Sequence, residues 1–317
     1  MQAGPRDQGN AGLVTLVALS LAVLLTACLG QPPVGSAETP APSHAPSAST
    51  GPGPSGSAGE EATLLAVGDI GYCNASNDDR VGKLAANLPG TIALLGDIVY
   101  EAGTAKDYAN CFNPTWGSLL DRIRPVPGNH DYETRDAAGY FGYFAVPSGP
   151  ADEGWYSYDL GAWHVIALNS ECGAIEGGCG KESVELDWLR ADLAAHPTQC
   201  TLAYWHHPRY SSGLHGDNAM TELFWAALSR AGADLVLSGH DHDYERLGPV
   251  DGIRSFVVGT GGRSLYPWPG SPGPHTEVRA NDTYGLLELT LRPADYAWRF
   301  IPAAGGSFTD SGHAACH

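Results

Sequence analysis

Short apolar runs recur along the chain from residue 62 onward, and most of them end at a glycine or a polar residue. A continuous apolar run of about four to eight residues indicates a strand buried on both faces. By this pattern the predicted strands are residues 62–67, 91–95, 123–126, 163–168, 201–205, 234–237, 253–258, 285–291 and 296–301.

Two longer stretches have the period of a helix instead. In residues 184–196, Leu186, Leu189 and Leu193 fall on one face, and residues 221–231 form the second predicted helix. Strands that alternate with helices predict an α/β fold with largely buried sheets. Polar residues that follow such strands converge at one rim of the sheet, where α/β proteins usually bind ligands.

The N-terminal part of the chain has a different pattern. Residues 11–27 are an apolar run of secretory length, and the run ends in Leu-Thr-Ala before Cys28. A branched apolar residue and two small residues before a cysteine are typical of the segment that is cleaved and lipidated in bacterial lipoproteins. We therefore predict a signal peptide over residues 1–28 with Cys28 as the lipidated residue; an ordinary cleaved signal peptide and a retained anchor helix are the alternatives.

Residues 29–61 are rich in proline, serine and glycine and have almost no large apolar residue. Such a segment buries too little surface to offset its ordering entropy, so we predict a flexible tether. Residues 62–317 then form one large folded domain. We expect an exported protein, held by its lipid at the outer face of a bacterial cell membrane or otherwise secreted, with the lipid as the only membrane attachment.

Six cysteines remain in the predicted domain once Cys28 is set aside. An even number of cysteines in an exported chain indicates three disulfides, although the spacing alone leaves the pairing open. The glycines between Cys172 and Cys179 favour a tight loop, which makes this the best-supported pair. The remaining candidates are Cys73 with Cys111 and Cys200 with Cys316.

The formal net charge is −18 at pH 7. A surface this acidic repels nucleic acid, so we expect no nucleic-acid partner.

Polar residues with metal-binding chemistry occupy five short blocks, each placed after an apolar run. The blocks are Gly68-Asp69-Ile70-Gly71, Gly96-Asp97-Ile98-Val99-Tyr100, Gly128-Asn129-His130-Asp131, Trp205-His206-His207-Pro208 and Gly239-His240-Asp241-His242. Carboxylates, an amide oxygen, a phenol and imidazoles together form an oxygen and nitrogen donor set that suits hard or borderline metals. One glycine–aspartate pair alone would more often cap a helix or turn. Five such blocks in this order, each after an apolar run, indicate a two-metal hydrolase instead.

In these blocks the chain resembles the calcineurin-like metallophosphoesterase superfamily, and more closely its purple acid phosphatase branch, over about residues 63–300. Generic members have Asp-x-His in the first block, whereas this chain has Gly71 there and carries Tyr100 three residues after Asp97. The resemblance implies an α/β sandwich of two mixed β-sheets flanked by helices, with the metal site at the carboxyl ends of the strands.

The resemblance also implies two metal ions bridged by Asp97. The first would be held by Asp69, Asp97, Tyr100 and His242, and the second by Asp97, Asn129, His206 and His240. A phenolate is a hard anionic ligand, so Fe(III) is expected at the Tyr100 site, with Zn, Mn or Fe at the second.

Two further histidines match catalytic residues of the family. His130 would contact the phosphate, and His215, nine residues after His206, would assist protonation of the leaving alkoxide. Gly216 departs from plant-type members, which have a second histidine there. We expect His207 to pack beneath the site, and we expect the glycine-rich stretch before Arg263 to form a tight turn near it.

The expected function is therefore an exported dinuclear metal-dependent phosphatase that hydrolyses small phosphate monoesters by attack of a metal-bound hydroxide. A phosphodiesterase on the same metals is the first alternative. A non-catalytic surface binding protein is the second. The oligomeric state stays open.

Overall fold

The computed structural model describes residues 60–73, 76–144 and 153–317. The predicted signal peptide, Cys28 and nearly all of the predicted tether lie outside the described residues. In the described ranges, no helix is both long and apolar enough to cross a membrane.

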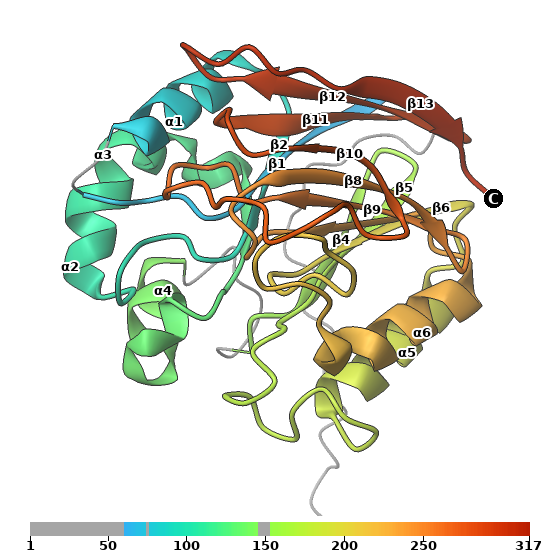
Figure 1. Cartoon of the computed structure of the whole chain (residues 1–317). Helices are drawn as coiled ribbons and strands as arrows, with labels where there is room; N and C mark the ends of the chain where they lie inside the picture. Colours follow the sequence, from blue (N-terminus) through green and yellow to red (C-terminus); the bar gives the residue numbers. More distant parts are fainter. Residues whose placement is uncertain (1–59, 74–75, 145–152) are drawn as a thin grey trace, which may run out of the picture. The chain divides into compact units, whose positions relative to one another are not determined.

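The strands form two mixed sheets (Figure 1). The first has the order β13-β12-β11-β1-β2-β3, and its strands are β1 Ala62–Val67, β2 Thr91–Leu95, β3 Ile123–Val126, β11 Gly285–Leu291, β12 Asp295–Pro302 and β13 Ser311–Ala315. The second has the order β10-β8-β9-β7-β6-β5-β4, and its strands are β4 Tyr156–Leu160, β5 Trp163–Ala167, β6 Cys200–Tyr204, β7 Leu235–Ser238, β8 Tyr244–Val250, β9 Ile253–Val258 and β10 Thr276–Ala280. The α/β fold of two mixed sheets is confirmed.

Parallel pairing joins one run of neighbouring strands in each sheet. Strands β1, β2 and β3, at one edge of the first sheet, run parallel, as do β5, β6, β7 and β9 within the second, while the remaining pairs are antiparallel. Parallel strands place their carboxyl ends at the same edge of a sheet. The loops after β1, β2, β3, β6 and β7 are the ones that carry the predicted metal ligands.

Alternate residues of the central strands face different apolar layers. In β1, Leu64 and Ala66 belong to the core between the sheets, whereas Leu65 and Val67 pack in the outer layer under the helices. Because both faces are covered, the strand reads as a continuous apolar run. A third layer lies between the second sheet and its helices, and it includes Leu186 and Leu189 as the helical period predicts.

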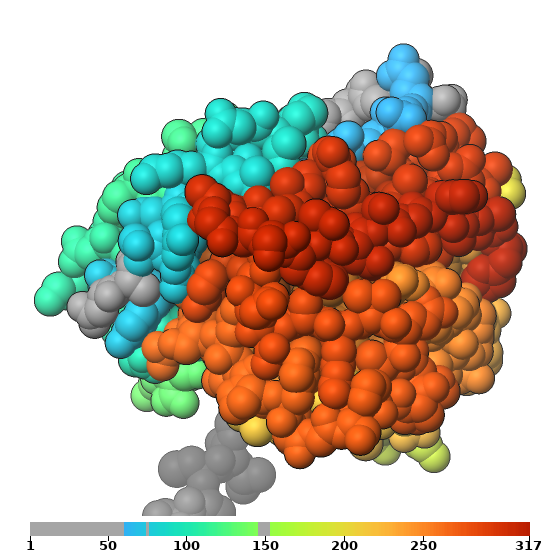
Figure 2. Space-filling model, turned by 45° about the horizontal axis from the view of Figure 1, so that its top comes forward, coloured from blue at the N-terminus to red at the C-terminus, as the bar shows by residue number. Residues whose placement is uncertain are grey.

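Helices cover the outer faces of both sheets. The first sheet is covered by α1 Asn77–Asn87 and by short segments: α2 Ala105–Asp107, η1 Tyr108–Phe112, α3 Asn113–Trp116, η2 Gly117–Arg122, η3 Asp131–Glu133, η4 Arg135–Ala137 and α4 Ala138–Tyr143. The second is covered by α5 Val184–Ala195 and α6 Glu222–Ala231, preceded by η5 Ala219–Thr221. Figure 2 shows the C-terminal part of the chain, coloured orange to red, gathered on one face beside the blue-to-cyan part that begins at residue 60.

Three disulfides join the cysteine pairs that the sequence favours. They link Cys73 with Cys111, Cys172 with Cys179, and Cys200 with Cys316. The last closes a separation of 116 residues and fastens the C-terminus to β6. Removing such a bond from a small secreted domain typically costs about 2–5 kcal/mol.

Candidate metal centre

Seven of the predicted side chains meet beyond the carboxyl ends of five parallel strands. We call this set the rim centre: Asp69, Asp97, Tyr100, Asn129, His206, His240 and His242. Most of these side chains are almost completely buried, so their polar atoms must be satisfied by one another or by a ligand.

The backbone bends sharply to bring these side chains inward. Asp69, Asp97 and His240 have φ values of 60°, 49° and 71°. A residue other than glycine held in this left-handed region costs about 1–3 kcal/mol, and such residues cluster at functional sites. The preceding glycines leave the necessary space: a Cβ on Gly96 would lie 2.6 Å from His206 Nδ1, and one on Gly239 would lie 2.7 Å from Asp69 Oδ2.

The first half of the rim centre surrounds the Tyr100 hydroxyl. Its oxygen lies 2.9 Å from Asp69 Oδ1, 2.9 Å from Asp97 Oδ2 and 3.1 Å from His242 Nε2. The other ring nitrogen of His242 donates to the carbonyl of Ser264 at 2.8 Å. This hydrogen bond fixes the tautomer and leaves Nε2 as the ligating atom.

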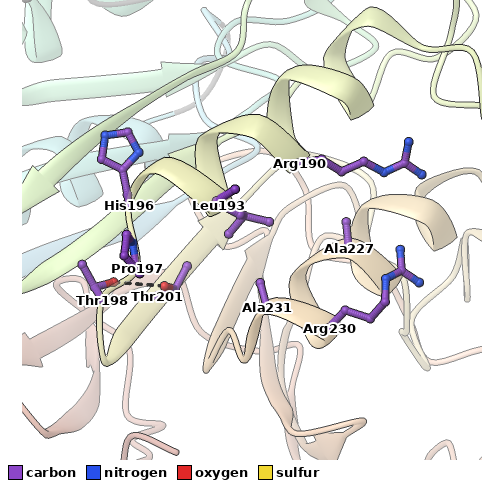
Figure 3. A pocket seen from close by; sticks show the side chains of 10 residues that line it. Arg190, Leu193, His196, Pro197, Thr198, Thr201, Ala227, Arg230 and Ala231 are labelled. Carbon is purple, nitrogen blue, oxygen red and sulfur yellow. Dashed lines mark hydrogen bonds between the residues drawn. The ribbon is translucent and has the colours of Figure 1, made fainter.

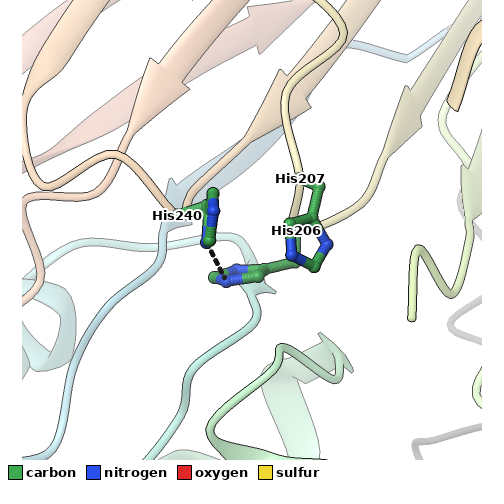
Figure 4. A group of neighbouring side chains, drawn as sticks. All are labelled: His206, His207 and His240. Carbon is green, nitrogen blue, oxygen red and sulfur yellow. Dashed lines mark hydrogen bonds between the residues drawn. The ribbon is translucent and has the colours of Figure 1, made fainter. Parts of the chain in front are cut away.

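The second half surrounds His206 Nε2. This atom lies 3.2 Å from Asn129 Oδ1, 3.2 Å from His240 Nδ1 and 3.4 Å from Asp97 Oδ1. Figure 4 shows the His206 and His240 rings meeting through these nitrogens. His206 Nδ1 donates to the carbonyl of Leu95 at 2.8 Å, which again leaves Nε2 free to bind.

Asp97 joins the two halves with one carboxylate. Its Oδ2 faces Tyr100, and its Oδ1 faces His206. The backbone N–H of His130 also donates to Oδ1, at 2.8 Å, which orients the group. A carboxylate that offers one oxygen to each half has the arrangement of a bridging ligand.

The electrostatics of the rim centre suit bound cations. Burial raises the pKa of the Tyr100 phenol well above its ordinary value, and the charges of Asp69 and Asp97 raise it further. Burial also opposes ionisation of Asp97, but the positive charge of His206 outweighs it and lowers the pKa of that carboxyl. Two buried carboxylates and a phenol converge here on one small region, and a hard or borderline metal ion is a favourable partner for such oxygen donors. The donor set therefore fits two metal ions.

The two predicted catalytic histidines lie beside the rim centre. The ring of His130 is centred 4.4 Å from that of Tyr100, and its Nδ1 donates to the carbonyl of Glu101 at 2.6 Å. The exposed ring of His215 is centred 4.3 Å from that of His240. One histidine thus flanks each half, next to solvent.

Asp241 holds the loop that presents His215. The sequence did not predict this role of Asp241. The side chain is fully buried, and it accepts from the backbone N–H of His215 at 2.7 Å and from Ser211 Oγ at 2.5 Å. Gly213 passes so close that a Cβ there would clash with Asp241. Asp241 therefore ties the His215 loop to the loop of His240 and His242.

His207 packs against the rim centre from below. It is buried, its ring is centred 4.3 Å from that of His240, and its Nδ1 lies 3.0 Å from Ser170 Oγ and 3.3 Å from Glu171 Oε1. Burial, together with the charge of His206, lowers the pKa of His207 to about 3. Ser170 and Glu171 were missed, although they follow the apolar run of β5 just as the predicted ligands follow theirs.

The glycine-rich stretch after β9 forms the expected tight turn. Backbone N–H groups of Gly261 and Arg263 donate to the carbonyls of Gly68 and Asp69, both at 3.0 Å. Beyond the turn, Tyr266 stacks on His242 with ring centroids 4.0 Å apart. The chain shows no local signal for Tyr266, because the stack depends on how two separate loops pack.

The fold and the rim centre define the class: an α/β sandwich with a candidate dinuclear metal centre at the rim of its parallel strands. More particularly, the chain belongs to the calcineurin-like phosphoesterase family, whose model matches residues 62–244.

Its relatives include purple acid phosphatases, as the sequence resemblance predicts. It is 29% identical to purple acid phosphatase 15 of Arabidopsis thaliana over 247 residues, which are 63% of this chain and 44% of the relative. It is 29% identical to human acid phosphatase type 7 over 278 residues, which are 72% of this chain and 61% of the relative. The chain thus spans about half the length of the relatives it matches.

A solved structure has the same fold. A purple acid phosphatase isolated from yellow lupin (Lupinus luteus) seeds superimposes with a TM-score of 0.67 at 16% sequence identity. The match covers 81% of this chain and 54% of the lupin chain.

Proposed function

We propose that this protein is an exported, dinuclear metal-dependent phosphatase that hydrolyses phosphate monoesters. The observation that carries the proposal is the carboxylate of Asp97, whose two oxygens face two separate ligand groups. Family membership and the acid phosphatase relatives support the reaction class.

In this proposal each half of the rim centre holds one ion. Asp69, Tyr100 and His242 hold the first, Asn129, His206 and His240 hold the second, and Asp97 contacts both. When bound, the two ions supply Lewis acidity toward the phosphate and lower the pKa of the attacking water. Tyr100 favours Fe(III) in the first half, and the nitrogen-rich second half suits Zn, Mn or Fe.

The two flanking histidines act on the substrate. His130 keeps its Nδ1 on the Glu101 carbonyl, so Nε2 is the atom available to bind a phosphate oxygen. His215 is exposed beside His240 and delivers a proton to the leaving alkoxide. Neither residue serves as a nucleophile.

Export is the second part of the proposal. Three disulfides in one domain are typical of proteins that fold in an oxidising compartment. Residues 1–28 would direct export and leave Cys28 lipidated, residues 29–61 would form the tether, and residues 62–317 the catalytic domain.

Activity on a matched pair of esters tests the reaction class. We expect kcat/KM for para-nitrophenyl phosphate to exceed that for bis(para-nitrophenyl) phosphate by about tenfold or more, which corresponds to about 1.4 kcal/mol of transition-state binding. Metal analysis of the same sample should give two ions bound at the rim centre. Faster hydrolysis of the diester would overturn the monoester assignment, and absence of hydrolysis in a fully metal-loaded sample would overturn the phosphatase.

A further inference from the structure

A second cluster of metal-ligating side chains lies at the C-terminal end of α5, on elements that the rim centre does not use. It consists of His164 on β5, Asp192 in the last turn of α5 and His196 directly after that helix. One ligating atom from each residue lies within 4.8 Å of the other two. We call these three residues the α5 cluster.

Asp192 contacts both imidazoles, whose rings stack on each other with centroids 4.4 Å apart. Its Oδ2 lies 2.7 Å from His164 Nε2, and its Oδ1 lies 3.3 Å from His196 Nδ1. The rim centre shows similar separations between its own ligand atoms, such as 3.4 Å between His206 Nε2 and Asp97 Oδ1. A carboxylate and two imidazoles are a donor set that binds Zn²⁺ with further positions left for water.

Two polar neighbours orient these groups. His164 Nδ1 lies 3.2 Å from Asp159 Oδ1, so the carboxylate holds the proton on Nδ1 and directs Nε2 toward Asp192. Ser157 Oγ donates to Asp192 Oδ1 at 2.7 Å. A carboxylate on the far nitrogen of a histidine is the usual support of a metal-binding imidazole.

The position also favours a cation. The last turn of a helix carries the negative end of the helix dipole, and Asp192 and His196 stand four residues apart on that turn. His164 is buried, whereas the side chain of His196 is 44% exposed. Water and ions therefore reach the cluster from the His196 side.

A surface cavity of about 490 Å³ lies between the end of α5 and helix α6, with His196, Pro197 and Thr198 among its lining residues (Figure 3). His164 and Asp192 do not line it, and the His196 ring points away from the lining side chains of the two helices. The water ligands that three protein donors leave unfilled would therefore come from the exposed side of His196.

We propose that His164, Asp192 and His196 bind one divalent ion of borderline hardness, such as Zn²⁺, as a third metal site. Binding displaces the proton that His164 Nε2 shares with Asp192 and keeps the proton on Nδ1 for Asp159. His196 Nδ1 also lies 2.9 Å from the carbonyl of Asp192, and the His196 ring stacks on that of His164. The ion must therefore displace the helix-capping contact and turn the His196 ring out of the stack, because a metal lies in the plane of each imidazole that binds it.

The test separates the third site from the rim centre by using the full chain with Asp97→Asn, in which the bridging ligand is lost. After equilibration with zinc at pH 7.5 and removal of loose metal, this variant should contain one more ion per chain than the double variant Asp97→Asn/His196→Gln. With Co²⁺ in place of zinc, the visible bands of the third ion should be lost with the same substitution. His313→Gln, which changes an exposed histidine on β13, is the matched control and should keep the ion.

A supporting variant tests the geometry. Asp159→Asn leaves all three ligands in place, and it should weaken binding of the third ion by about tenfold or more. Phosphatase activity of the otherwise native chain should be unchanged by His196→Gln, so failure here and failure of the proposed function are distinguishable. Equal metal content with and without His196 would overturn the site and leave His164, Asp192 and His196 as a hydrogen-bond network.

Discussion

The rim centre gathers its side chains from five loops that extend from Asp69 to His242, whereas the α5 cluster takes its three from one strand and one helix end. The converging loops of the rim centre need unusual backbone conformations: Asp69, Asp97 and His240 adopt left-handed φ values, and each follows a glycine. The α5 cluster needs nothing of the kind, because the helical period itself places Asp192 and His196 on one face. Similar ligand chemistry thus arises from two kinds of local structure.

The largest expected effect is the loss of the residue that both halves of the rim centre share. Asp97→Asn should lower kcat/KM for a phosphate monoester by about a thousandfold or more, because several kcal/mol of metal-derived stabilisation disappear. Steady-state kinetics and metal analysis on the same sample measure it. His196→Gln is the control from the α5 cluster and should retain full activity; near-normal turnover by Asp97→Asn would exclude Asp97 as the bridging ligand.

The next effect concerns the phenol that distinguishes the first half. The iron-loaded protein should absorb visible light through charge transfer from Tyr100, and Tyr100→Phe should abolish this band while lowering activity by about tenfold or more. Absorption spectroscopy reads the band directly. Tyr266→Phe keeps its stack on His242 and is the matched control. An active but colourless, iron-free native protein would contradict the Fe(III) assignment.

A smaller effect is expected from the support of the His215 loop. Asp241→Asn replaces one of two acceptor oxygens with an N–H donor, so the His215 backbone N–H and the Ser211 hydroxyl can no longer both donate to this side chain. The variant should lower kcat by about tenfold with little change in KM, since a small misplacement of a catalytic group is enough for such a loss. Steady-state kinetics over a pH range separate the effect on kcat from that on KM. Asp251→Asn, at an exposed position, is the control. An unchanged kcat would mean that the loop holds His215 without Asp241.

The smallest expected effect is on the free energy of unfolding, and it concerns the α5 cluster when a chelator keeps it free of metal. Burial lowers the pKa of His164, but the hydrogen bond and charge of Asp192 outweigh it and raise that pKa above 6.5. Burial raises the pKa of Asp192, and the hydrogen bond from His164 outweighs it and lowers that pKa below 3.8. The pair therefore stabilises the fold fully between pH 3.8 and pH 6.5, and its contribution declines as the pH rises through the folded pKa of His164.

His164→Gln should accordingly lower the free energy of unfolding by about 2 kcal/mol near pH 5.5 and by less near pH 8. Urea unfolding at the two pH values provides the measurement. The His313→Gln variant should show no such difference. If His164→Gln lowered the free energy of unfolding equally at pH 8 and at pH 5.5, His164 would contribute by packing alone.

The sequence predicts the central strands well because each is an apolar run covered on both faces. β1, β2 and β3 have the predicted bounds. It does not predict β4, whose residues are mostly half-buried, or β13, which is largely exposed, nor α1, whose first turn is polar and which contains Gly82. These elements are stabilised by the neighbours against which they pack rather than by a pattern of their own.

The same distinction applies to the candidate sites. Each ligand of the rim centre stands next to a recognisable strand end, so Asp69, Tyr100 and His240 can be found from local sequence. Asp241 and Tyr266 act through contacts between separate loops, and no local pattern reveals such contacts. His164 looks like an ordinary strand residue until β5 is packed against α5.

The long span of the rim centre has a consequence for assembly. Its first and last ligands, Asp69 and His242, belong to different sheets of the sandwich. Neither a nascent chain that ends before β7 nor a fragment cut between the sheets contains a complete set of donors. Metal uptake would therefore report that parts of both sheets, up to the end of β7, have come together. A chain that stalls before this point would be inactive and would lack the stabilisation that bound ions provide.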